Sequence, residues 1–204
     1  RNHSSAASDV YKRQAKPMPD RLIIGISGAS GVIYGVRLLE LLKPSPVETH
    51  LVMTKSAQIT LAHETGYKIA DVQALADIAH SADDIAASIS SGSFRTMGMV
   101  VAPCSMRSLS EIAYGNTTHL LTRAADVVLK ERRRLVLLPR ETPLHLGHLR
   151  AMTAATEAGA IIAPPAPAFY ANPGSIGEMV DYTLARVMDL FDVDLLPVNR
   201  WKGG

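Results

Sequence analysis

Short apolar runs alternate with longer stretches in which apolar residues recur at helical spacing along most of this chain. The first run, 22–26, is too short for a helix. A turn rich in glycine and serine follows it, and then Val32, Val36 and Leu39 share one helical face. This pattern predicts a strand, a tight turn and a helix. The turn places backbone N–H groups and hydroxyls at a helix N-terminus, where they attract phosphate.

The same alternation predicts five strands in all. The other four are expected at 50–53, 97–102, 135–138 and 160–163, with helices between them. One helix is expected to begin with Thr142 as N-cap and Pro143 as the first helical residue, and to end at Gly159. Near-continuous apolar strands separated by helices indicate a parallel sheet covered on both faces. The expected fold is therefore a single-domain, Rossmann-like α/β fold of three layers.

Composition limits the function classes. Four of the 21 basic and two of the 19 acidic side chains lie in residues 1–20, which accounts for the net charge of +2 and leaves the rest neutral. Nothing in this balance points to nucleic acid. No apolar run approaches the roughly 20 residues of a membrane span. Cys104 is the single cysteine, so an intramolecular disulfide is impossible and a cytoplasmic location is expected.

Residues 1–20 differ in character from the remainder. They are polar, show no periodicity and lack the apolar core of a signal peptide. We expect them to be a disordered extension or a cloning remnant. The expected folded domain is 21–204.

Residues suited to chemistry follow the carboxyl ends of four predicted strands. They are found at 27–31, at Thr54, at 104–108 and at 140–141. Ligands of parallel sheets bind beyond these strand ends, so one pocket can collect all four groups. The spacing of Gly25 and Gly28 is not that of a dinucleotide fingerprint, and Thr54 stands where an acid would hold a ribose. We therefore expect a phosphorylated ligand other than a dinucleotide.

Each candidate also has a structural interpretation. Ser105 can be an N-cap as well as a phosphate ligand, and Cys104 can be a small buried residue instead of a nucleophile. Lys130 suits a solvated helix end as well as a phosphate pocket. Arg140 can grip phosphate while Glu141 transfers a proton, or the two can form a surface ion pair.

Two further pairs are open in the same way. Tyr170 follows a proline-rich segment that fixes its direction, and Arg186, off the apolar stripe of the last helix, can meet it; the alternative is a packed tyrosine and an exposed arginine. His145 and His148 have the spacing of metal ligands, but no third ligand is evident, so no metal is expected.

Several segments together resemble the UbiX-type flavin prenyltransferases, also called the UbiX/Pad family. They are 25–31, 103–105, 123–132, 139–143 and 169–170. The resemblance extends from about residue 21 to residue 201 and is greatest to the enterobacterial type that serves ubiquinone biosynthesis. It implies the flavoprotein version of the expected fold.

The resemblance also implies an activity and a site. The dimethylallyl group of dimethylallyl monophosphate is joined to N5 and C6 of reduced FMN, and the prenylated FMN serves a UbiD-type decarboxylase. The implied FMN-binding residues are Gly28, Ala29, Ser30, Thr54, Ser105, Met106, Arg107, Ser108, Arg123 and Arg140. The implied substrate-binding residues are Lys130, Arg140, Tyr170 and Arg186, some of them from adjacent subunits of a homododecamer. The implied catalytic residues are Glu141, Lys130 and Glu64, with no metal.

Two other functions stay open on the sequence. A flavin-dependent cysteine decarboxylase would carry a catalytic histidine and a Pro-x-Met-Asn-x-x-Met-Trp segment, and residues 164–170 do not match that segment. A flavin carrier without enzymatic activity would not need Lys130, Glu141 and Arg186 around a second phosphate. Both are therefore less well supported than prenyl transfer.

Overall fold

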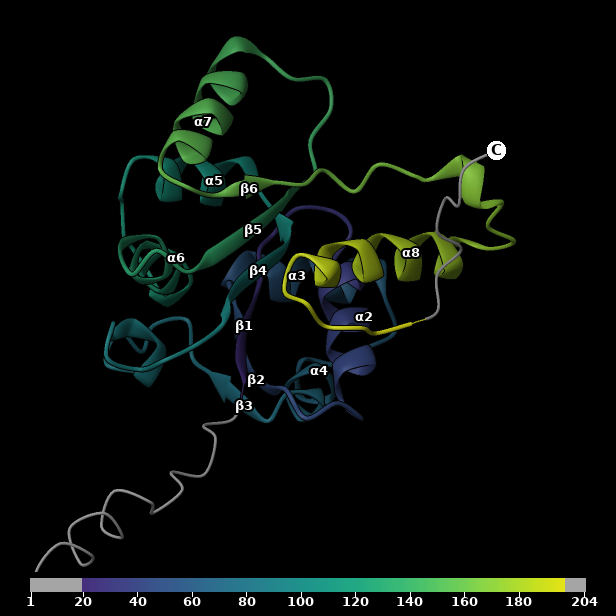
Figure 1. Cartoon of the computed structure of the whole chain (residues 1–204), viewed down its shortest axis with the longest axis horizontal. Helices are drawn as coiled ribbons and strands as arrows, with labels where there is room; N and C mark the ends of the chain where they lie inside the picture. Colours follow the sequence, from purple (N-terminus) through teal and green to yellow (C-terminus); the bar gives the residue numbers. More distant parts are fainter. Residues whose placement is uncertain (1–19, 197–204) are drawn as a thin grey trace, which may run out of the picture.

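The computed structural model describes residues 20–196 (Figure 1). Apart from Asp20, the expected N-terminal tail lies outside the described residues, as do residues 197–204 of the expected domain.

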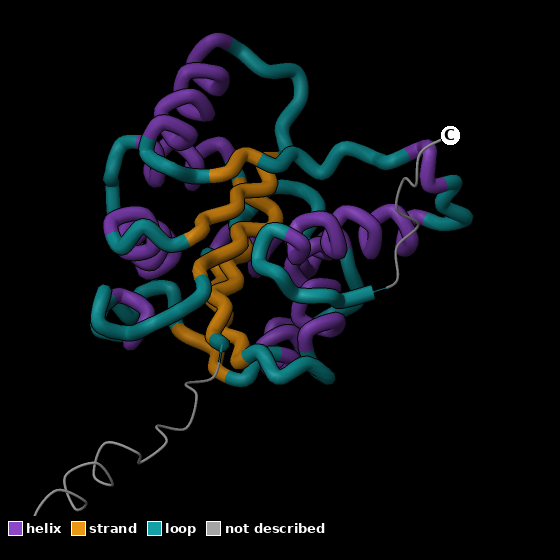
Figure 2. Tube along the Cα trace, in the orientation of Figure 1, coloured by secondary structure: helices purple, strands orange, loops and turns teal. Residues whose placement is uncertain are grey.

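A parallel sheet runs through the centre of the molecule (Figure 2). Its strands are β1 (Arg21–Ile26), β2 (Glu48–Met53), β3 (Ile78–His80), β4 (Gly98–Cys104), β5 (Arg134–Pro139) and β6 (Ile161–Ile162). Their order is β3-β2-β1-β4-β5-β6, and each neighbouring pair is parallel. All seven residues of β4 are buried, as expected for a strand covered on both faces.

Helices cover both faces of the sheet (Figure 1). On one face lie α2 (Ile33–Leu42), α3 (Lys55–Glu64), α4 (Ile69–Leu75) and α8 (Ile176–Asp189); on the other lie α5 (Met106–Ala113), α6 (Leu120–Lys130) and α7 (Leu146–Glu157). Successive strand residues serve opposite layers: Val100 packs with the first group and Val101 with the second. The three-layer α/β prediction is confirmed.

The predicted number of five strands is wrong, because the sheet has a sixth strand, β3, within the described residues. It pairs with β2 through Ile78 and His80 at the edge of the sheet. It has only three residues, and Ile78 and Ala79 are exposed, so no apolar run marks it in the sequence. Such a short, exposed edge strand is set by pairing with its neighbour.

The predicted start of the helix after β5 is also wrong. Thr142 does not cap it, and the Thr142–Pro143 peptide is cis. The helix α7 begins at Leu146, and His145 is its N-cap. The imidazole Nδ1 of His145 accepts from the backbone N–H groups of Gly147 at 3.0 Å and His148 at 3.3 Å. Histidine is an uncommon cap, so the sequence signal pointed to the more usual threonine.

A close approach of helix and sheet fixes the position of α2. A Cβ added to Gly35 would lie 2.4 Å from the carbonyl oxygen of Ala102 and 2.6 Å from Cγ1 of Ile26. Only glycine allows the α2 backbone to lie this near to β1 and β4. The N-terminus of α2 is thereby held at the carboxyl edge of the sheet, beside the loop that follows β1.

Candidate active site

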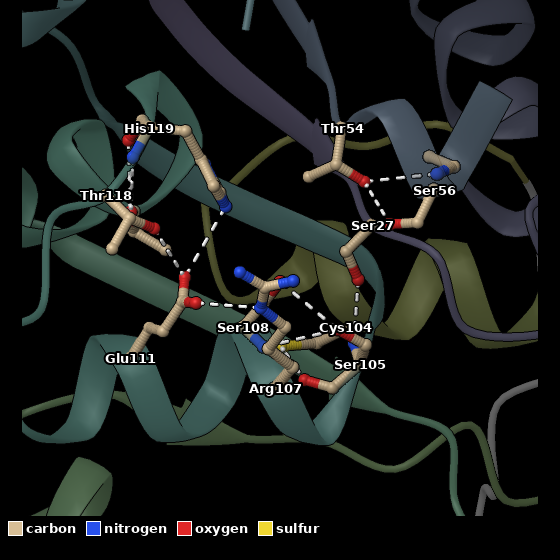
Figure 3. Close-up of polar contacts among 12 residues, drawn as sticks. Ser27, Thr54, Ser56, Cys104, Ser105, Arg107, Ser108, Glu111, Thr118 and His119 are labelled. Carbon is tan, nitrogen blue, oxygen red and sulfur yellow. Dashed lines mark hydrogen bonds and ion pairs between the residues drawn. The ribbon is translucent and has the colours of Figure 1, made fainter. Parts of the chain in front are cut away.

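A buried serine joins the loops that follow β1 and β4. The Ser27 hydroxyl donates to the carbonyl oxygen of Pro103 at 2.8 Å and accepts from the N–H of Ser105 at 2.7 Å (Figure 3). Ser105 in turn caps α5, because its Oγ accepts from the N–H of Ser108 at 3.2 Å. The N-cap interpretation of Ser105 is confirmed, and the first turn of α5, from Met106 to Ser108, opens at the carboxyl edge of the sheet.

The N-terminus of α3 lies at the same edge. Thr54 Oγ1 accepts from the N–H of Ala57 at 3.1 Å and hydrogen-bonds the Ser56 hydroxyl at 3.0 Å. A Cβ on Gly28 would lie 2.4 Å from Ser56 Oγ, so glycine lets the loop after β1 pack against α3. Thr60 Oγ1 also donates to the carbonyl oxygen of Gly28 at 3.1 Å. These contacts hold Gly28, Ala29 and Ser30 beside α3.

A cavity of about 240 Å³ lies between the N-termini of α3 and α5. Its lining residues are Thr54, Lys55, Ser56, Ala82, Asp83, Ser105, Arg107, Ser108 and His119. Lys55 forms an exposed ion pair with Asp83 at 2.9 Å. Two helix N-termini, several hydroxyls and two cations at one opening make a site suited to a dianionic phosphate.

Two backbone N–H groups of the turn after β1, which the sequence suggests as phosphate donors, already have an acceptor within the chain. Glu64, at the end of α3, accepts from the N–H of Gly31 at 2.8 Å and of Val32 at 3.3 Å. The N-cap of α2, Val32, supplies no side-chain acceptor, so the glutamate takes that role. Burial opposes ionisation of Glu64, but hydrogen bonds from Ser30, Gly31 and Val32 outweigh it and hold the pKa of the carboxyl below its ordinary value.

Glu64→Gln is expected to lower the free energy of unfolding at pH 7 by about 0.5 kcal/mol, because a solvent-screened charge at the α2 N-terminus is lost. Since the pKa of Glu64 is depressed, this contribution is complete above the unfolded pKa of about 4.3 and is lost as the pH falls through the folded pKa. Urea unfolding of both proteins from pH 7 down to about pH 3 measures the gap between their free energies of unfolding. The gap should narrow in acid, and a constant gap would contradict the assignment; Glu157→Gln on α7 is the control.

Arg140 lies beside the same loop. Its side-chain Nε donates to the carbonyl oxygen of Ser30 at 3.2 Å, and its backbone N–H donates to the carbonyl oxygen of Cys104 at 3.3 Å. Burial raises the pKa of the Tyr34 hydroxyl, although the nearby charge of Arg140 acts in the opposite direction. Glu141 follows, exposed, and its Oε1 accepts from the N–H of Thr142 at 3.0 Å. The chain thus gathers Arg140 and Glu64 around the loop after β1.

Lys130 lies at the other edge of the sheet. It ends α6, four residues before Arg134, which pairs with Gly98 at the start of β4. The length of β5, on the order of 20 Å, separates this amino edge from Arg140. Lys130 Nζ pairs with Glu131 at 2.6 Å, and Arg123, on the same helix, pairs with Asp126 at 2.9 Å. A single chain does not bring Lys130 to Arg140, so the two can meet only across a subunit boundary.

Tyr170 and Arg186 are presented on a separate arm. After β6 the chain extends away from the sheet to the short helix η2 (Phe169–Ala171) and returns as α8 (Figure 1). The Tyr170 and Tyr182 hydroxyls hydrogen-bond each other, and the two rings meet edge to face at 5.9 Å. Arg186, one turn after Tyr182, pairs with Asp189. Tyr170, whose side chain is exposed, therefore meets α8 one turn before Arg186 and not at Arg186 itself.

Other sequence candidates have structural roles. Cys104 is fully buried, and burial raises the pKa of its thiol, which favours a small packed residue over a nucleophile. The His145 and His148 rings stack at 3.6 Å. Residues 20–196 contain no group of three or more histidine, cysteine or acidic side chains arranged to hold a metal ion. In the same part of the chain, no helix is long and apolar enough to cross a membrane.

The structure also brings residues to the site that the sequence analysis does not single out. Lys55 and His119 line the cavity, and Glu111 contacts both Arg107 and His119 at its rim. Glu111 lies four residues after Arg107 on α5, a spacing that signals side-chain contact on a helix. Lys55 and His119 carry no comparable signal, because they reach the cavity only through the packing of α3 and α6.

The fold and this edge of the sheet define a flavoprotein: the family model described as Flavoprotein matches residues 11–188. The chain is 60% identical over 187 residues to the flavin prenyltransferase UbiX of Escherichia coli K12, a match that covers 90% of this chain and 98% of that protein. The chain belongs to the UbiX family of flavin prenyltransferases. The resemblance seen in the sequence is confirmed.

Two solved structures agree with this assignment. AnUbiX (PadA1) in complex with FMN and dimethylallyl pyrophosphate is 50% identical, with a TM-score of 0.89 over 91% of this chain and 98% of that one. The dodecameric FMN-dependent UbiX-like decarboxylase of Escherichia coli O157:H7 is 50% identical, with a TM-score of 0.87 over 90% of this chain and all of that one. The cysteine decarboxylase TvaF, at 18% identity and a TM-score of 0.57, shares the fold alone.

Proposed function

We propose that this protein transfers the dimethylallyl group of dimethylallyl monophosphate to N5 and C6 of reduced FMN with release of phosphate. The product, prenylated FMN, is the cofactor of a UbiD-type decarboxylase in ubiquinone biosynthesis. The observation that carries this proposal is the 60% identity to a flavin prenyltransferase along 98% of that enzyme. The 18% identity to a cysteine decarboxylase gives that alternative no comparable support.

The carboxyl edge of the sheet fits FMN. The cavity between α3 and α5 offers hydroxyls, helix N-termini and the cations Lys55 and Arg107 to the phosphate end of the molecule. The loop after β1 and Arg140 would then hold the ring end. We assign FMN binding to Gly28, Ala29, Ser30, Thr54, Ser105, Met106, Arg107, Ser108 and Arg140, with Arg123 from an adjacent subunit.

The residues around the second phosphate assist its departure. Bound reduced flavin supplies the carbon and nitrogen nucleophiles of the reaction. Cations at the phosphate oxygens stabilise the charge that develops as the C–O bond breaks, and Arg140, Lys130 and Arg186 are assigned this role. Glu141 holds the proton that the leaving phosphate receives, and Tyr170 orients the phosphate. Aromatic faces stabilise an allylic cation, and a closed pocket excludes water from it.

The placement of Lys130 supports an oligomer in which subunits complete one another's sites. We propose a homododecamer, as found for the Escherichia coli O157:H7 relative. We also propose that residues 21–204 form one domain. We further propose that the protein acts in the cytoplasm, since a chain with a single cysteine does not depend on an intramolecular disulfide and suits a reducing compartment.

The function is tested by anaerobic incubation of the protein with reduced FMN and dimethylallyl monophosphate, followed by mass spectrometry of the flavin. Prenyl transfer predicts a flavin heavier by one C5 unit, in amounts that grow with time. A flavin carrier predicts bound FMN of unchanged mass. A peptide with a C-terminal cysteine, incubated with oxidised FMN, tests the decarboxylase alternative through the loss of CO₂ from the peptide.

A further inference from the structure

A carboxylate at the rim of the cavity has three partners. Glu111 Oε1 accepts from Arg107 Nε at 2.9 Å, and Oε2 accepts from Thr118 Oγ1 at 3.1 Å and lies 3.4 Å from His119 Nε2 (Figure 3). Thr118 and His119 precede α6, whereas Arg107 and Glu111 belong to α5. The carboxylate therefore joins two elements that flank the cavity.

Burial differs sharply between the two charged partners. The Glu111 side chain is only 12% exposed, whereas the Arg107 side chain is 81% exposed. Burial lowers the pKa of His119, although the charge of Glu111 acts in the opposite direction, and the imidazole Nε2 lies 3.4 Å from the Glu111 carboxylate. Glu111 is thus the buried member of the pair, and its hydrogen bond restrains an arginine side chain that is otherwise exposed.

Only part of the Arg107 guanidinium is used by this contact. Within residues 20–196, Glu111 is the hydrogen-bond partner of Arg107, and it takes the Nε–H. The four N–H bonds on the two terminal nitrogens are left for another acceptor. Because Arg107 lines the cavity, these donors lie at the opening where two helix N-termini already favour phosphate.

We propose that Glu111 is a positioning residue that aims the guanidinium of Arg107 at the phosphate of FMN, with Thr118 and His119 fixing its carboxylate. This inference rests on the proposed function, because it names a further determinant of the same flavin site. Holding the long arginine side chain near its bound position reduces the entropy that FMN binding must otherwise remove. A carboxylate that only repelled the phosphate would have the opposite effect on affinity.

Comparison of FMN with riboflavin isolates the phosphate. Dissociation constants of both flavins are measured by titration of the full chain and of its Glu111→Ala, Glu111→Gln and Arg107→Ala variants. Glu111→Ala is expected to weaken FMN binding by about five- to tenfold and to leave riboflavin binding unchanged, since a charge-assisted contact is misplaced. Glu111→Gln, which keeps an acceptor oxygen, should lose less. Glu157→Gln is the control.

A double variant tests whether Glu111 acts through Arg107. In the Arg107→Ala background, Glu111→Ala should cause no further loss of FMN affinity, because the residue that it positions is gone. Equal losses for FMN and riboflavin would mean a general structural role and would overturn the proposal. Unchanged or tighter FMN binding by both Glu111 variants would overturn it as well.

The positioning role of Glu111 and the prenyltransferase activity can be disproved separately. If the unmodified protein forms prenylated FMN while the Glu111 variants keep full FMN affinity, the positioning role is wrong and the proposed function stands. If the unmodified protein binds FMN no better than riboflavin and forms no prenylated flavin, both are wrong.

Discussion

Glu141→Gln is expected to slow prenyl transfer by about 10²- to 10⁴-fold, the range set by loss of a general acid. FMN binding should change little, because the one hydrogen bond of Glu141 in the described structure goes to the neighbouring N–H of Thr142. The amide has the size of the acid but carries no transferable proton. The phosphate then has to leave the dimethylallyl group without a proton, as an ion of higher charge and lower stability in the same pocket.

Single-turnover mass spectrometry of the flavin measures this step apart from product release. The titration of FMN described above, applied to the same variant, shows whether the cofactor site is intact. Glu178→Gln in α8 is a matched control, since Glu178 accepts from the N–H of Gly174 at 2.7 Å and is exposed like Glu141. Transfer by Glu141→Gln at the unmodified rate would contradict the proton-donor role.

Local features of the fold follow from the sequence because their causes are local. The caps Thr54 and Ser105 precede the helices that they open, and their hydroxyls bond N–H groups three residues away. The apolar strand β4 is recognisable because covering on both faces requires a continuous apolar run. The same reasoning misses β3, whose pairing with β2 depends on residues about 28 positions earlier in the chain.

In the candidate site, too, local features can be predicted from the sequence and long-range contacts cannot. The sequence places Arg140 and the loop after β1 at one sheet edge, and the structure puts them in contact. It does not show that Glu64 occupies the N–H groups of Gly31 and Val32, because that contact crosses a separation of 33 residues. The sequence also does not show how far Lys130 lies from Arg140. The two residues are only ten positions apart, yet Lys130, at the end of α6, lies at the opposite edge of the sheet.

Lys130→Ala is expected to lower kcat/KM for dimethylallyl monophosphate by about 10²-fold, because a cation that stabilises the leaving phosphate is removed. The stability of the subunit should be nearly unchanged, since the Lys130–Glu131 pair is exposed and such pairs contribute little. Kinetics of the purified variant at saturating reduced FMN measure the loss. A variant as active as the unmodified protein would exclude Lys130 from the phosphate site.

Mixed oligomers show where Lys130 acts. If the Lys130 of one subunit completes the Arg140–Glu141 site of another, coexpressed Lys130→Ala and Glu141→Gln chains should regain about one quarter of full activity, because random mixing pairs two intact residues at that fraction of heterologous contacts. Were Lys130 to serve its own chain, every site would carry one substitution and activity would stay at the level of the two parents. The measured prenyl transfer of the mixed oligomer, set against each parent alone, decides between the two arrangements, and the position of Lys130 at the amino edge of the sheet predicts the recovery.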